Sequence, residues 1–140
     1  MKQFIFYKIR NDFDLFKNKE MLYVFYDLLL RKNHSEFYKI QVENLLDFID
    51  KKSFNKKIIE QFSNFKTFNV NVNGDFTINS QISDNFEVLC IKDNHLILNS
   101  KTKNSKFLDF ISLYYPEFII IDNNNHQISS LSLVNPLKIS

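Results

Sequence analysis

The chain has 140 residues, of which 44% are hydrophobic and 16% aromatic, and it carries a formal net charge of +2. This apolar content can offset the conformational entropy lost on folding, which excludes an intrinsically disordered protein, and the length fits a single domain over residues 1–140. Arginine occurs only at Arg10 and Arg31, which argues against a protein that grips duplex DNA, because such proteins usually present a denser basic face.

The N-terminal residues predict a strand followed by a short charged connector. Residues 3–9 are rich in Phe, Tyr and Ile, which is typical of a strand. A short helical turn that carries Phe13 and Phe16 is predicted next, with Asn11 or Asp12 as its N-terminal cap. The charged neighbours of these two rings leave two interpretations open. The rings belong to the core, or they lie at the boundary with water and anchor a partner protein.

Three further segments before residue 66 have a recognisable pattern. Residues 20–32, EMLYVFYDLLLRK, predict a helix whose apolar side chains cover nearly its whole circumference. Such a helix is enclosed by its own domain or covered by a partner. Residues 36–43 alternate weakly and predict a second strand, whereas residues 44–50 and 55–65 predict helices.

Two hairpins are predicted in the middle of the chain. The stretch FNVNV-NG-DFTIN alternates apolar and polar residues on both sides of Asn73-Gly74, and it uses the only glycine of the chain where a positive φ is needed. The stretch FEVLCIK-DN-HLILN repeats this arrangement, with Asp93-Asn94 as a two-residue turn.

The C-terminal third predicts a helix between strands. Residues 105–115 form an amphipathic pattern that Pro116 ends, and residues 118–122, FIIID, predict a strand buried on both faces. An edge strand is predicted before Pro136. The order of elements indicates an α/β fold of the α+β type, a compact domain with a largely antiparallel sheet flanked by helices. The expected core of this region includes Phe107, Phe110, Ile111 and Ile120.

The residue types that usually carry chemistry form no recognisable catalytic or metal-binding motif. The single glycine excludes a phosphate loop and a dinucleotide-binding fingerprint. One cysteine, Cys90, and three histidines without ligand spacing give no zinc pattern, so neither a metal nor a cofactor is expected. A small enzyme with a cryptic carboxylate site stays open as an alternative. Its candidate acids are Asp84, Glu87, Asp109 and Asp122.

The sequence also predicts a cytoplasmic protein. The N-terminal stretch MKQFIFYKIR has too short an apolar run for a signal peptide, and no apolar stretch approaches the length that crosses a bilayer. The lone cysteine excludes an internal disulfide, which fits a reducing compartment.

Both ends of the chain resemble the sporulation inhibitor of replication family. The N-terminal resemblance lies in Ile9-Arg10, Asp12-Phe13, Phe16 and Lys19-Glu20, which follow an aromatic strand and open a long apolar helix. The C-terminal resemblance lies in the stretch IKDNHLILNSKTKNSKFLDFISLYYPEFIIIDNNN and in Val-Asn-Pro at residues 134–136. The connector between Phe13 and Glu20 is one residue shorter in this chain than in the family pattern, and Lys39 stands where a neutral amide is expected.

The resemblance implies a bacterial inhibitor of DNA replication rather than an enzyme. Members of the family bind the N-terminal domain of the initiator DnaA and block replication initiation when the cell commits to sporulation. A monomer that binds its partner one to one is therefore expected, without nucleic acid or membrane. The partner-binding residues implied here are Phe13, Phe16, Lys17, Lys39 and Gln41.

Two other classes of binding protein stay open beside this one. A single-stranded nucleic-acid-binding module would stack bases on sheet aromatics such as Phe76 and Phe86. A phage-type regulator would share the fold and bind a different replication protein.

Overall fold

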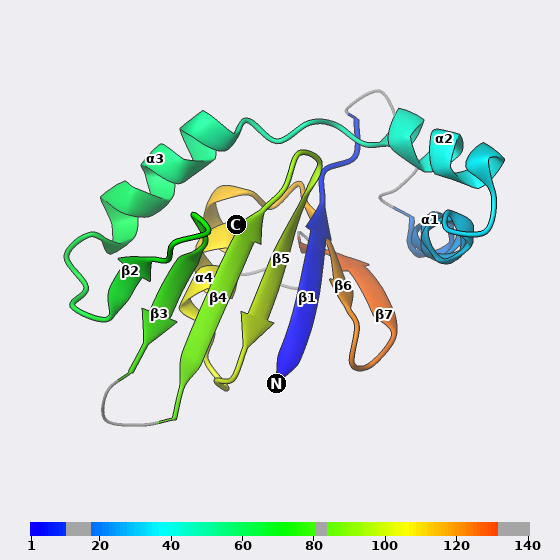
Figure 1. The fold of residues 1–140 in the computed structure, drawn as a ribbon. Coiled ribbons are helices and arrows are strands. Elements are labelled where there is room, and N and C mark those ends of the chain that lie inside the picture. Colours follow the sequence, from blue (N-terminus) through cyan, green and yellow to red (C-terminus); the bar gives the residue numbers. More distant parts are fainter. Residues whose placement is uncertain (11–17, 81–83, 132–140) are drawn as a thin grey trace.

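The computed structural model describes residues 1–10, 18–80 and 84–131. Within these ranges the chain forms four helices and one seven-stranded sheet, which confirms the predicted α+β fold (Figure 1). The helices are α1 (Lys19–Arg31), α2 (Glu36–Leu45), α3 (Lys51–Phe62) and α4 (Lys106–Tyr114). The strands are β1 (Lys2–Tyr7), β2 (Phe68–Val70), β3 (Phe76–Asn79), β4 (Phe86–Ile91), β5 (His95–Ser100), β6 (Ile119–Asp122) and β7 (Gln127–Ser130).

The strands follow the order β2-β3-β4-β5-β1-β6-β7, and all neighbouring pairs are antiparallel. The N-terminal strand β1 lies inside the sheet, where Phe6 is opposite Leu96 of β5 on one side and Ile120 of β6 on the other. The predicted edge strand before Pro136 is β7, the last strand of the sheet. Residues 132–140, with the Val-Asn-Pro stretch, lie outside the described residues.

Both predicted hairpins form, but only one has the predicted turn. Lys92 donates its backbone N–H to the carbonyl of His95 at 2.9 Å, so Asp93-Asn94 is the two-residue turn that the sequence predicts. In the β2–β3 hairpin the backbone N–H of Asn71 instead donates to the carbonyl of Asp75 at 2.9 Å. This pairing leaves a loop of three residues, in which only Gly74 has a positive φ, at 84°. The predicted two-residue turn at Asn73-Gly74 was therefore wrong in length and right in its use of glycine.

Substitution of Gly74 tests that conformation. A Cβ at this position would meet no atom within 4 Å, so the cost of a side chain is purely conformational. We expect Gly74→Val to lower the free energy of unfolding by about 1–2 kcal/mol, because β-branched residues resist a left-handed backbone. Gly74→Asn should cost less, since Asn tolerates this region. Urea denaturation of both variants measures the difference, and equal stabilities would show that φ at Gly74 is not what limits substitution.

The larger hydrophobic core lies between one face of the sheet and helices α3 and α4. In Figure 1, α4 is seen behind the sheet. Phe110 of α4 contacts Phe54 and Phe62 of α3, with ring centroids 6.0 and 5.6 Å apart. The four residues expected in the core, Phe107, Phe110, Ile111 and Ile120, are all buried, which confirms that prediction.

A second core lies on the opposite face, beneath α1 and α2. Both helices lie together at the right of Figure 1, over the end of the sheet that contains β1, β6 and β7. Leu22, Phe25 and Leu29 form the buried side of α1. Strand β6 contributes to both cores, because Ile119 and Ile121 face the second core and Ile120 faces the first. The prediction that residues 118–122 are buried on both faces is thus confirmed.

Residues 36–43 form most of α2, so their prediction as a strand was wrong. Ser35 begins the helix, because its hydroxyl accepts a hydrogen bond from the backbone N–H of Phe37 at 3.2 Å. The alternation of apolar and polar residues in this segment does not reflect a half-buried strand. Val42 is the only buried residue of α2, and its large apolar residues Phe37 and Ile40 are exposed.

Residues 44–50 were predicted as a helix, which was also wrong. The helix α2 ends at Leu45, and Leu46 then forms an antiparallel bridge with Ile9. The backbone N–H of Asp47 donates to the carbonyl of Lys8 at 2.8 Å. These bonds to the segment after β1 hold the chain extended until Asp50, which caps α3. Compared with the helix predicted over residues 55–65, α3 starts a few residues earlier and also ends a few residues earlier.

Candidate functional site

Several large apolar side chains are exposed on α1 and α2, beside charged residues such as the exposed Asp27–Arg31 pair. On α1, Val24 is 51% exposed and lies one turn before the half-buried Leu28. On α2, Phe37 is 63% exposed and Ile40 is 49% exposed. The two helices contact each other, and the guanidinium of Arg31 lies 5.9 Å from the centre of the Tyr38 ring. We call Val24, Phe37, Ile40 and the half-buried Gln41 the outer helical face.

A shallow groove of about 370 Å³ runs along the other flank of α1. Its lining includes Tyr23 and Leu30, which are exposed, and His126 from the turn between β6 and β7. The helix predicted to be apolar all round therefore buries one side on the sheet and leaves apolar side chains exposed on its outer side and on this flank.

The five residues predicted to bind a partner do not all fall in the described part of the chain. Phe13, Phe16 and Lys17 lie outside the described residues, in the segment that joins β1 to α1. Lys39 is exposed and Gln41 is half-buried, both on α2. Two helical residues that are two positions apart point about 200° apart, so these side chains lie on different flanks of the helix. Gln41 belongs to the outer helical face, whereas Lys39 lines a pocket beside the β4–β5 turn.

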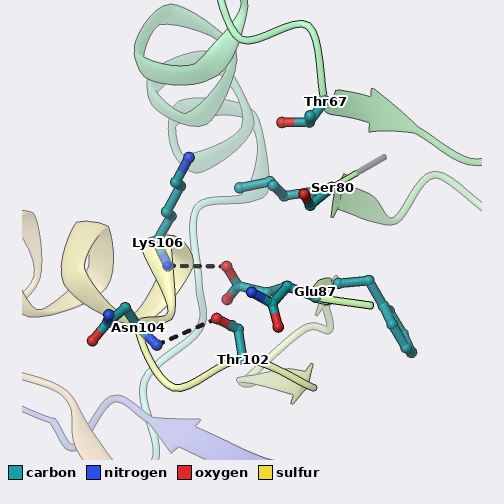
Figure 2. Close-up of a pocket in the computed structure, with 9 residues that line it drawn as sticks. Thr67, Ser80, Glu87, Thr102, Asn104 and Lys106 are labelled. Carbon is teal, nitrogen blue, oxygen red and sulfur yellow. Dashed lines mark hydrogen bonds between the residues drawn. The ribbon is translucent and has the colours of Figure 1, made fainter. Parts of the chain in front are cut away.

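A pocket with a polar lining lies between the end of β3 and the start of α4 (Figure 2). It has a volume of about 320 Å³, and Glu87 is buried at its base with 2% exposure. The Glu87 carboxylate accepts hydrogen bonds from the Ser105 hydroxyl and, at 2.9 Å, from the backbone N–H of Lys106. Burial raises the pKa of Glu87 despite these hydrogen bonds. The carboxylate thus satisfies donors at the N-terminus of α4, which is a structural role.

The raised pKa of Glu87 predicts a pH dependence of stability. Because the pKa of Glu87 is higher in the folded than in the unfolded protein, the folded state binds the carboxyl proton more tightly. The free energy of unfolding therefore increases as pH falls from the raised pKa of the folded state to the ordinary pKa of the unfolded state. We expect the difference in unfolding free energy between the wild type and Glu87→Gln to shift in favour of the wild type as pH is lowered. Urea denaturation of both proteins across this range measures it, and a pH-independent difference would contradict the raised pKa.

The four acids of the possible carboxylate site have separate roles. Asp84 is exposed and pairs with Lys101 at 3.5 Å. Asp122 orders the β6–β7 turn, where its carboxylate accepts the backbone N–H groups of Asn124 and Asn125 at 3.0 and 3.2 Å. Only Asp109 lies close enough to Glu87 to act on its pKa, and it raises that pKa.

Two other candidates from the sequence also have defined surroundings. Cys90 is half-buried, and burial raises the pKa of its thiol, which keeps the unreactive protonated form at neutral pH. Phe76 is 3% exposed and belongs to the larger core, whereas Phe86 is half-buried at the polar pocket. Among the residues that the structure describes, no three His, Cys, Asp or Glu side chains gather in a way that could hold a metal ion.

The sequence matches no protein-family model, and no curated protein resembles it significantly. None of the described helices has the length and apolar character needed to cross a bilayer.

Proposed function

We propose that this protein is a non-enzymatic inhibitor of replication initiation that binds the N-terminal domain of the bacterial initiator DnaA, at the onset of sporulation. The binding surface in this proposal is the outer helical face, together with the segment before α1 that contains Phe13, Phe16 and Lys17. The resemblance at both ends of the chain supplies the identity of the partner.

The observation that supports a protein partner is the exposure of large apolar side chains on α1 and α2. Phe37 and Ile40 come from adjacent turns of one helix, and Val24 comes from the helix beside it. Isolated exposed apolar residues are ordinary, but several on one pair of contacting helices are typical of a surface that a partner covers. The aromatic ring of Phe37 is the kind of side chain that carries binding energy at such surfaces.

The base-stacking alternative has less support. Phe76 is buried in the larger core, so its ring is not available to stack on a base. The phage-type regulator remains the second candidate, because the same outer helical face would serve another replication protein equally well.

Calorimetric titration of the full chain with the isolated N-terminal domain of DnaA tests the proposal. We expect saturable one-to-one binding, with an affinity that depends little on salt because the proposed contact is mainly apolar. The same titration with single-stranded DNA serves as the comparison, where a steep loss of affinity with salt would favour a nucleic-acid-binding module. The absence of binding to the DnaA domain would remove this partner from consideration.

A further inference from the structure

A small pocket of about 170 Å³ lies where α1, α2, β1 and the β4–β5 turn meet. By a comparable measure of volume one water molecule needs only about 10–15 Å³, so the pocket has room for a larger polar group. Its walls come from distant parts of the sequence. The lining residues are Tyr7, Lys32, Asn33, Lys39, Val42, Glu43, Leu46 and Asn94.

The lining combines an apolar floor with a rim of hydrogen-bond donors. Val42, Leu46 and the ring of Tyr7 are buried and form the floor. Tyr7 is only 5% exposed as a residue, and it lines the cavity without a hydrogen bond from its hydroxyl to another described residue. The hydroxyl is therefore available to donate a hydrogen bond to a group that enters the pocket.

The charges of the rim are positive in sum. Lys32 and Lys39 contribute two positive charges and Glu43 one negative charge, which leaves a net charge of +1 on the lining. Neither lysine forms a salt bridge with a described residue. The Lys51–Asp93 pair nearby is a separate contact, at 2.7 Å.

His95 lies against this pocket and responds to its charge. The imidazole is tilted over the Tyr7 ring, with centroids 5.5 Å apart, and its Nδ1 lies 2.7 Å from Oδ1 of Asn94. Burial lowers the pKa of His95 most, followed by the positive charges of Lys32 and Lys92, while Asp93 acts in the opposite direction. The neutral imidazole can donate from Nδ1 to Oδ1, and Asn94 then keeps its amide N–H groups free to donate into the pocket.

We propose that this pocket binds a phosphate group, either as the free ion or as the monoester of a small molecule. Two ammonium groups, the Tyr7 hydroxyl and the amides of Asn33 and Asn94 supply the donors that a tetrahedral oxyanion needs. Glu43 selects phosphate over other anions. Inorganic phosphate near neutral pH, and a phosphate monoester in its singly ionised form below a pKa of about 6, each retain one proton that can be donated to the Glu43 carboxylate, whereas sulfate and ionised carboxylates have no proton to donate.

This site is separate from the outer helical face, because Lys39 and Gln41 point to different flanks of α2. The proposal therefore does not depend on the partner protein, and its test needs only the isolated chain.

The test is an NMR titration of the histidine ring signals of the full chain with inorganic phosphate, at constant ionic strength set with chloride. We expect the His95 signals to shift in a saturable way, and the pKa of His95 to rise, because the bound anion offsets the charge of Lys32. His126, in the exposed β6–β7 turn, is the internal control and should not shift in a saturable way. A parallel titration with glycerol 3-phosphate distinguishes the two sources, since the tighter ligand shows whether the group arrives free or as a monoester.

Four variants and two other anions make the result specific. Lys39→Gln and Lys32→Gln should each weaken phosphate binding about tenfold or more, as expected for the loss of a charge-assisted contact. Lys56→Gln, at an exposed site on α3, should leave it unchanged. Sulfate and acetate should bind more weakly than phosphate to the wild type, and Glu43→Gln should reduce the preference for phosphate over sulfate.

Several results would overturn the proposal. A linear or absent shift of His95 would mean that phosphate does not occupy the pocket. Equal binding of phosphate, sulfate and acetate would mean a general attraction of anions to the lysines. Unchanged affinity in Lys39→Gln and Lys32→Gln, relative to Lys56→Gln, would place any bound phosphate elsewhere.

Discussion

Replacement of Phe110 by Ala is expected to lower the free energy of unfolding by about 3–5 kcal/mol, the usual cost of removing a buried aromatic ring. Phe110 is 4% exposed and lies between the two helices of the larger core. Its ring contacts the rings of Phe54, Phe62, Tyr114 and Tyr115 at centroid distances of 6.0, 5.6, 5.2 and 6.0 Å. The cavity left by its removal would be lined by rigid rings, which collapse poorly and therefore keep the cost high.

Denaturant unfolding of Phe110→Ala and of Leu113→Ala gives a matched comparison within α4. Leu113 is 51% exposed on the same helix, and its truncation is expected to change the free energy by only about 0.5 kcal/mol. If both variants unfold at the same denaturant concentration, the packing of α4 onto α3 does not hold the larger core together.

Removal of the Phe37 ring is expected to weaken binding to the N-terminal domain of DnaA about 30-fold, which corresponds to about 2 kcal/mol. Phe37 is 63% exposed in the free protein, so Phe37→Ala should leave the free energy of unfolding within about 0.5 kcal/mol of the wild type. Ile40→Ala should act in the same direction with a smaller effect, because it removes less surface. The combination of lost affinity and unchanged stability distinguishes a contact residue from a core residue.

The control for this pair is Val72→Ala. Val72 is fully exposed in the β2–β3 loop, at the end of the sheet opposite to β6 and β7. It should change neither affinity nor stability. Binding that is equally strong in Phe37→Ala, Ile40→Ala and the wild type would exclude the outer helical face as the interface, and Phe13→Ala and Phe16→Ala would then test the segment before α1.

The elements that the sequence predicts correctly are those whose signals lie within a few residues. The β4–β5 turn at Asp93-Asn94 and the end of α4 before Pro116 each depend on local turn or capping chemistry. The class of the sheet follows from the two hairpins, since hairpins make antiparallel neighbours. Even there, the pairing of Asn71 with Asp75 lengthens the β2–β3 loop by one residue, which alternation alone does not indicate.

The segment between residues 36 and 50 shows why the remaining elements could not be predicted. Ser35 was a local signal for a helix start that the weak alternation after it concealed. The extended stretch after Leu45 has no local cause, because it pairs with Lys8 and Ile9, far away in sequence. The candidate site has the same property. Exposure of Phe37 and Ile40 depends on how α2 rests on the second core, and the pocket at Tyr7 joins four separate segments.

The interior position of β1 has a consequence for the order of events during protein synthesis. Its neighbours in the sheet, β5 and β6, end at Ser100 and Asp122, so both sides of β1 can be paired only after most of the chain has been made. At about 5–20 residues per second, translation from Tyr7 to Asp122 takes roughly 6–23 s. During that interval the hairpins of β2 to β5 can form from local contacts, whereas the first strand to leave the ribosome waits longest for its partners.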